Sequence, residues 1–403
     1  MLPLFGSPPA DLLFAHPVTQ SFALPFSPLV AAVAGSFAVF MVALVWPSRD
    51  EREPRSEPQL TSWAGRLSLP QIATRAAAVL VLALAIAAGR LGSDDQLENL
   101  APALIVGAVW PLLVLISTVV GPVWRWTDPW DGVARPFAPG DTDRSPGNVW
   151  PAVVAALVWV WYLSAYPDAL EPGSVGAILA LYTVATVAGC LAMGRVRWLA
   201  SSEPLGIVLS WMARVSRRRL ADWQPPAGAE SLLGVLAGGV LFGAVRRSEL
   251  WGDLNADPNS LLWATVGVVG AGLIVAGLLE GMARAAERGR SGVARGAVPA
   301  VAGIVVAVAL DFNRLFTSVQ LLPGLLGDPF GEGWDLLGRA GAGLDPAPLG
   351  VDGLLWAQLG VLLAGHLAGA VVVARGLPPG DRAPGAAVLA VLTAASVIAV
   401  ITH

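Results

Sequence analysis

The chain has 403 residues, of which 55% are hydrophobic and only 13% charged, and its formal net charge at pH 7 is −4. A soluble domain cannot bury this much apolar surface, and the sequence lacks the basic excess that a nucleic-acid-binding protein carries. The composition therefore predicts a protein embedded in a lipid bilayer, with no nucleic-acid partner.

The apolar residues fall into segments of the length that a membrane requires. A helix needs roughly 17 to 25 apolar residues to cross a hydrocarbon core about 30 Å thick. Ten segments meet or approach this length: Phe26–Trp46, Pro70–Ala88, Leu100–Val120, Trp150–Tyr166, Ser174–Met193, Ser231–Val245, Ser260–Gly281, Ala297–Gln320, Gly353–Ala374 and Ala386–Ile401. The fourth, sixth and tenth are short. The predicted fold class is all-α, a polytopic membrane helix bundle of about ten transmembrane helices, which occupies residues 26–402.

Residues 1–25 precede the first apolar segment and contain no Lys or Arg. The sequence that follows this segment, Pro47-Ser48-Arg49-Asp50, does not resemble a small-residue cleavage site. We therefore expect a retained first helix and an extracytoplasmic N-terminal segment over residues 1–25.

The orientation of the bundle is predicted from arginine, because the chain contains no lysine. Arginines gather after the odd-numbered segments, at Arg49, Arg52, Arg55, Arg66, Arg125, Arg135, Arg144, Arg195, Arg197, Arg214, Arg217, Arg218, Arg219, Arg284, Arg288, Arg290, Arg295, Arg375 and Arg382. The even-numbered connections hold only Arg90, Arg246, Arg247 and Arg339. The positive-inside rule then places the odd connections in the cytoplasm and both termini outside, as expected for a multi-pass protein of the plasma membrane.

One predicted cytoplasmic stretch, residues 203–220, has helical periodicity of its own. It begins with Ser202-Glu203-Pro204, a typical helix start, and arginines crowd its end. We interpret it as an amphipathic helix on the inner leaflet, with a docking helix for a partner as the alternative.

Small residues four positions apart mark places where membrane helices can approach closely. Such pairs occur at Gly234 with Gly238 and at Gly239 with Gly243 in the sixth segment, and at Gly277 with Gly281 in the seventh.

Ionisable residues at membrane depth are costly and are candidate functional groups. Asp311 and Arg314 lie three residues apart in the eighth segment, where they can pair on one helix face. Either they form a structural ion pair, or they belong to a proton relay, an ion site or a metal site. His366 is either a hydrogen-bonded helix contact or a ligand, although it has no partner histidine for a bis-histidine haem. Glu280 with Arg284 is interpreted as an ion pair at the inner interface.

Two connections carry denser patterns, residues 123–132 and residues 327–338. In the second, Asp328, Glu332 and Asp335 offer oxygen ligands that could converge on a cation. A Gly- and Pro-rich turn with an interfacial Trp is the simpler interpretation.

Four motifs together resemble one known family. They are Trp-Arg-x-x-Asp-Pro-Trp at 124–130, Ser-Glu-Pro at 202–204, Asp-Pro-Phe-Gly-x-Gly-Trp-Asp-Leu at 328–336 and Ala-Gly-His at 364–366. The chain is similar over most of its length to actinobacterial polytopic membrane proteins named fenitrothion hydrolase. This resemblance implies a membrane-bound enzyme that hydrolyses organophosphate triesters at a site on the outer side.

Two classes of function remain open. A phosphotriester hydrolase needs an activated water and electrophilic help at phosphorus, which a divalent metal supplies. Its candidate residues are Asp311 and Arg314 as catalytic groups, and His16, Asp328 and Asp335 as metal ligands. The alternative is a transporter or a non-catalytic subunit of a membrane complex, with a second membrane subunit as partner. The sequence contains no zinc-protease, Walker-type or serine-hydrolase signature.

Overall fold

The computed structural model describes residues 27–47, 63, 66–138, 148–216, 220, 223–254, 257, 259–286, 290–309, 312–339, 345 and 349–402. These residues form helices and the connections between them, with no β-strand among them. The all-α prediction is confirmed.

Nine helices in the described part of the chain are long and apolar enough to cross a membrane. They are α2 (Pro28–Val45), α3 (Leu69–Leu91), η1 with α4 (Pro102–Val109 and Trp110–Val119), α8 (Pro172–Met193), α11 (Ala229–Arg247), α13 (Leu261–Ala285), α14 with η2 (Arg290–Ile304 and Val305–Ala309), α16 (Gly350–Gly376) and α17 (Arg382–Thr402). The remaining predicted segment, the fourth, is the shorter helix α7 (Trp150–Ala165). Each predicted segment therefore has a helical counterpart, and α11 is longer than its predicted fifteen-residue core.

Local sequence signals explain where several of these helices begin. The Ser27 hydroxyl accepts a hydrogen bond from the backbone N–H of Val30, at 3.3 Å, and caps α2. Before α3, the backbone N–H of Ser68 donates to Gln71 Oε1 at 3.0 Å, as in a capping box. Proline stands in the first turn of both helices, where its missing N–H costs nothing.

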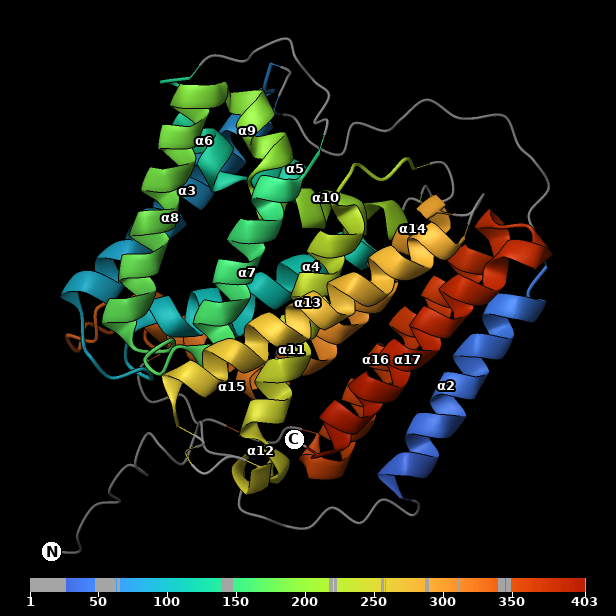
Figure 1. Ribbon diagram of the computed structural model, residues 1–403. Coiled ribbons are helices and arrows are strands. Elements are labelled where there is room, and N and C mark those ends of the chain that lie inside the picture. The colour runs from blue at the N-terminus through green and yellow to red at the C-terminus, as the bar shows by residue number, and fades with distance from the viewer. Residues whose placement is uncertain are drawn as a thin grey trace, which may run out of the picture.

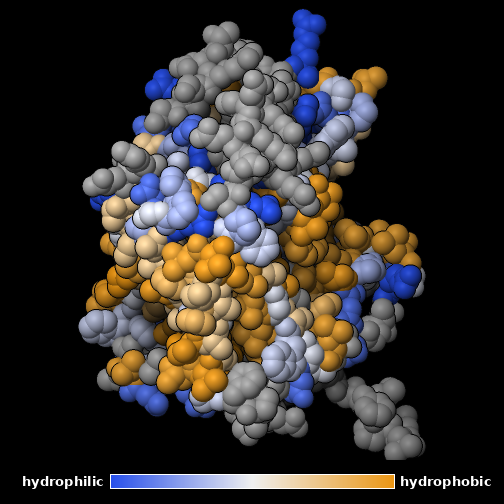
Figure 2. Space-filling view, turned by 90° about the vertical axis from the view of Figure 1, so that its right-hand side faces the viewer, coloured by the Kyte–Doolittle hydropathy of each residue, from blue (hydrophilic) through white to orange (hydrophobic). Residues whose placement is uncertain are grey.

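The connections carry shorter helices, which separate into two ends of the bundle. Helices α5 (Trp124–Thr127), α6 (Pro129–Ala134), α9 (Arg195–Ser201) and α10 (Pro204–Ser216) lie at one end, whereas α12 (Glu249–Leu254) and the C-terminus lie at the other (Figure 1). Between these ends, hydrophobic side chains gather in a broad band (Figure 2). The separation follows the odd and even connections.

Helix α11 lies inside the bundle, where it packs against α7, α13 and α14. Glycines allow these contacts: a Cβ atom at Gly234 would lie 2.4 Å from Ala276 Cα, and one at Gly238 would lie 2.3 Å from Ala271 O. The predicted close approach at these glycines is confirmed. Gly277 and Gly281 instead face open space, so the prediction for that pair is wrong.

Two other expectations require correction. The eighth segment was expected as one helix over 297–320, but α14 begins at Arg290, changes to a π-helix at Val305, and is followed by a separate helix, α15 (Phe312–Gly327). The helix expected within 203–220 is present as α10, but most of its residues are buried by the protein itself, largely against α4. It therefore neither lies on a leaflet nor offers a free docking face.

Candidate functional site

A cavity of about 270 Å³ lies within the bundle, next to the end that carries α5, α6 and α10. Its lining residues come from nine helical elements: Ala78, Val81 and Leu82 of α3; Ile105 and Val109 of η1; Trp110 and Leu113 of α4; Trp124 and Thr127 of α5; Pro129 and Trp130 of α6; Ala156 and Trp159 of α7; Ile178, Leu179 and Tyr182 of α8; Pro204, Leu205 and Val208 of α10; and Leu236 of α11. None of the described residues that line the cavity is charged. Its volume is nearly twice that of the ~150 Å³ engineered apolar cavity that takes up benzene.

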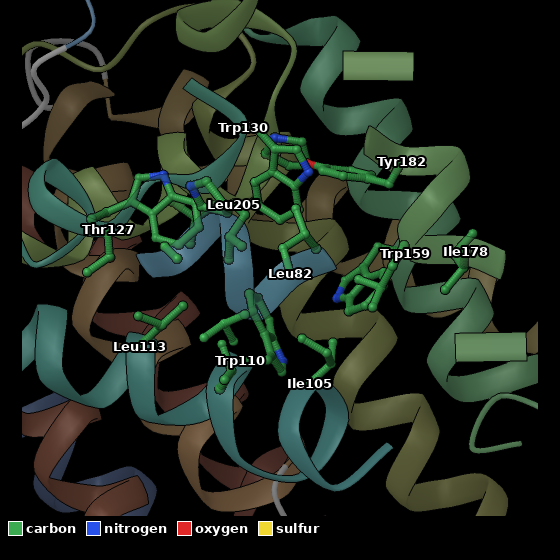
Figure 3. Close-up of a pocket in the computed structure, with 18 of the residues that line it drawn as sticks. Leu82, Ile105, Trp110, Leu113, Thr127, Trp130, Trp159, Ile178, Tyr182 and Leu205 are labelled. Atoms are coloured by element: carbon green, nitrogen blue, oxygen red, sulfur yellow. The ribbon is translucent and has the colours of Figure 1, made fainter. Parts of the chain in front are cut away.

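Figure 3 shows how the walls face one another. Ile178 and Tyr182 project from one side and Leu113 from the opposite side, with Trp110 between them. The rings of Trp110 and Trp159 meet edge to face, with their centroids 6.5 Å apart. Large rigid side chains thus form the walls, and the smaller Ala78 and Ala156 leave the space between them.

The π-helix η1 sets the position of one wall. In its last wide turn, the backbone N–H of Trp110 donates to Ile105 O, five residues earlier. Pro111 follows and has no N–H to contribute to the helix. Single π turns in α-helices often accompany functional sites, and this one carries two lining residues and leads directly into a third.

The cavity is partly open. At the α5–α6–α10 end it is closed by Trp124, Trp130 and Pro204, all of which are buried. On its sides the lining includes exposed Val81, which lies within the membrane-length helix α3. The lining therefore includes a side chain that is exposed on the outside of a membrane-length helix.

A buried carboxyl group lies behind the closed end. Glu203 accepts hydrogen bonds from the Tyr182 hydroxyl at 2.5 Å, from the Leu205 N–H at 2.9 Å and from the Gly206 N–H at 2.6 Å. Burial and the nearby charge of Asp128 raise the pKa of Glu203 to about 7, against the opposing effect of these three donors. Because Tyr182 also lines the cavity, one hydrogen bond connects the wall to a group that titrates near neutrality.

Asp128 is the second buried carboxyl group at this end. It caps α6 by accepting the N–H of Asp131 at 3.0 Å, and it accepts the Trp63 indole N–H at 2.7 Å. Burial raises its pKa to about 6, although the bond from Trp63 and the charge of Arg75 lower it.

Asp131 lies next to Asp128 and binds three arginines. Arg75, Arg135 and Arg195 all form salt bridges to its carboxylate, the one from Arg135 at 2.8 Å. Arg195 also donates to Ala138 O at 2.9 Å. The cluster joins α3, α6 and α9, so it fixes the helices above the cavity and does not itself enter it.

Of the site residues predicted from the sequence, the two whose side chains are described, Asp328 and Asp335, do not line this cavity. His16 and Asp311 lie outside the described residues, and of Arg314 only the backbone, in α15, is described. Asp328 and Asp335 lie in the loop after α15, which contacts the α3–η1 connection through a hydrogen bond from the Ser93 N–H to Phe330 O.

Within that loop, Asp328 organises the backbone. Its carboxylate accepts the N–H groups of Glu332, Gly333 and Trp334 at 3.0, 2.5 and 3.0 Å. Slight burial raises the pKa of Asp328, but these backbone donors outweigh it and lower the pKa overall. The simpler interpretation of the loop as a turn fits this geometry. Across the described residues, no group of three or more His, Cys, Asp or Glu side chains is arranged to hold a metal ion.

The predicted ion pair of Glu280 and Arg284 is present, at 3.0 Å. His366 is fully buried, but its Nδ1 lies 2.9 Å from Leu362 O in its own helix, so this bond does not join two helices.

The sequence alone did not predict the two buried carboxyl groups, Glu203 and Asp128, or the cavity. The Trp-rich connection at 123–132 contains Asp128, and Ser202-Glu203-Pro204 contains Glu203. Neither pattern indicates that Glu203 contacts Tyr182 or that Asp128 lies near Arg75. The cavity has no local signal, because its walls come from residues up to 158 positions apart, Ala78 and Leu236.

The helices and the apolar band define the class: this is an integral membrane protein, a multi-pass all-α helix bundle. No family model, curated protein or solved structure matches the chain.

Proposed function

We propose that the protein takes up a lipophilic small molecule from the bilayer into the cavity between α3, α4, α7 and α8. The observation that carries this proposal is the cavity itself, which is apolar, partly open and lined by membrane-spanning helices. Ligand sites are typically concave, mainly apolar and bordered by a few polar groups. Here the bordering groups are Tyr182 and the carboxyl group of Glu203.

Binding of this kind is the first step for a transporter or for an enzyme that acts on a membrane-soluble substrate. Phosphotriester hydrolysis, the reaction implied by the resemblance, is the second candidate. The observation that favours it is Glu203, because a carboxyl group with a pKa near 7 can exchange protons at neutral pH. Organophosphate triesters are neutral and lipophilic, as the cavity requires.

The binding proposal is tested with bis(4-fluorophenyl)methane, an apolar probe observed by ¹⁹F NMR in nanodiscs. Ala156 is buried and lines the cavity, so Ala156→Phe fills the space. Val154→Phe adds the same ring on an exposed position of α7 and is the matched control. We expect a bound signal, above that of empty nanodiscs, for the natural chain and for Val154→Phe, and its loss in Ala156→Phe. Equal signals for all three proteins would contradict the proposal.

Hydrolysis is tested separately, by release of the nitrophenol from fenitrothion in membranes that contain the protein. If the cavity is the site, Ala156→Phe and Glu203→Gln abolish release; if the site predicted from the sequence is correct, Asp311→Ala abolishes it and Ala156→Phe does not. Release no greater than that of empty membranes would remove the hydrolase candidate and leave the binding proposal in place.

A further inference from the structure

The lining of the cavity presents almost only apolar surface. Thr127, Trp130 and Tyr182 each donate a hydrogen bond from their side chain to a protein atom outside the lining. The indole nitrogens of Trp110 and Trp124 are buried, so a molecule in the cavity does not reach them. A polar group placed in this cavity would therefore lose its own hydrogen bonds with almost no replacement, which is unfavourable.

The cavity is also a poor place for water or for empty space. Apolar cavities remain dry, because a water molecule in them finds too few polar partners. An empty cavity deprives the atoms of its wall of their dispersion contacts. A cavity of ~150 Å³ takes up the six carbon atoms of benzene, so the volume of about 270 Å³ suits about ten carbon atoms. The content that this cavity favours is thus a hydrocarbon of about that size.

The surrounding bilayer supplies such a hydrocarbon. Val81 of the lining lies near the middle of the membrane-length helix α3, and its side chain is exposed on the outside of the bundle. At that depth in the hydrocarbon core, the molecules beside the protein are lipid acyl chains. At the α5–α6–α10 end, buried Trp124, Trp130 and Pro204 close the cavity, so a lipid head group does not follow a chain into it.

We infer that the ligand of this cavity is the terminal part of a lipid acyl chain, which enters without polar substituents while its head group stays at the membrane surface. This inference rests on the proposed binding function and specifies its ligand class. Other apolar molecules then enter by replacing the chain, and a chain with a polar group in its terminal half is disfavoured.

A matched pair of fluorinated lipids tests this inference. The first is a phosphatidylcholine with one 16,16,16-trifluorohexadecanoyl chain, and the second carries an additional hydroxyl group at carbon 10 of that chain. In ¹⁹F NMR of nanodiscs, the aromatic rings of the wall displace the signal of a trifluoromethyl group in the cavity from its position in empty nanodiscs. For the natural chain, we expect a bound population of the first lipid that exceeds that of the second about fivefold or more.

Two variants locate the bound chain. Ala156→Phe fills the cavity and should abolish the displaced signal of the first lipid, whereas Val154→Phe, on the exposed side of α7, should retain it. The comparison of the two lipids uses the natural chain alone, so a misfolded variant cannot imitate its result. Equal bound populations of the two lipids, or a displaced signal that persists in Ala156→Phe, would overturn the inference.

Bis(4-fluorophenyl)methane in parallel nanodisc samples separates this inference from the proposed function. If this probe binds the natural chain and neither lipid gives a displaced signal, the inference fails and the binding proposal stands. If neither the probe nor the lipids bind, both proposals fail.

Discussion

Glu203 illustrates how a single residue joins several parts of this protein. It lies before α10, where its carboxyl group accepts the first free N–H groups of the helix, and it also accepts the Tyr182 hydroxyl from α8. Burying a carboxyl group raises its pKa unless charge or hydrogen bonds compensate. Here burial prevails, so the group that positions α10 above the cavity changes charge near neutral pH.

The stability of the protein should therefore depend on the ionisation of Glu203. Its pKa of about 7 in the folded state exceeds the value of about 4.3 in an unfolded chain, so the folded state binds an extra proton between these values. The stability that Glu203 contributes is fully present below about pH 4 and is lost as the pH rises toward 7. Over this range we expect the free energy of unfolding to fall by on the order of 3 kcal/mol more in the natural chain than in Glu203→Gln.

Thermal unfolding in nanodiscs at pH 5 and pH 8 measures this difference. Asp128 has a pKa of about 6, so part of the pH dependence of stability remains in Glu203→Gln. Exposed Glu249 offers the control, because Glu249→Gln should preserve the full pH dependence. Identical slopes in the natural chain and in Glu203→Gln would show that Glu203 is ionised throughout.

At the scale of elements, the crossing of α11 and α13 depends on the absence of side chains. The backbones approach so closely at Gly238 that a Cβ atom would overlap Ala271 O and the neighbouring backbone. A backbone carbonyl cannot move aside as a flexible side chain can. The helices would have to separate, which would also disturb α7 on the other face of α11.

We expect Gly238→Val to destabilise the protein by about 2 kcal/mol or more, because overpacking forces the two helices apart. Gly277→Val introduces the same side chain on α13, at a glycine that faces open space, and should be nearly neutral. Unfolding of both variants in mixed micelles, followed by circular dichroism, compares them. If both variants lost the same amount of stability, helix propensity and not the helix crossing would determine the effect.

At the scale of the whole molecule, the two ends differ in their connections. The end with α5, α6, α9 and α10 contains the Asp131 cluster, and the opposite end contains α12 and the C-terminus (Figure 1). Because the odd connections carry most of the arginines, the positive-inside rule predicts that the first end faces the cytoplasm.

A reporter fused after His403 should accordingly lie outside the cytoplasm. Alkaline phosphatase at this position is expected to be active, and green fluorescent protein dark. Fusions within the connection that carries α10 should give the reverse pattern. A fluorescent C-terminal fusion would invert the predicted orientation and move the carboxyl groups to the outer side.

The helices were predictable and the site was not, for physical reasons that particular residues illustrate. A bilayer requires long apolar helices with all backbone groups paired, so segments such as Ser174–Met193 are visible in composition alone. The partners of Asp131 are 56 and 64 residues away, at Arg75 and Arg195, and no local period encodes such distances. The switch to π-helix at Val305 was also missed, because apolar composition does not distinguish helix types.

The enclosure of α11 has a consequence for how the chain is assembled. This helix is the least apolar of the nine membrane-length helices and one of the two most deeply buried. The ribosome delivers it after α7 but before α13 and α14, so two of the neighbours that enclose it are made only afterwards. We therefore expect α11 to reach its final packing only after α13 and α14 are made, and substitutions in α13 that weaken this contact to make α11 the segment most readily lost from the membrane during synthesis.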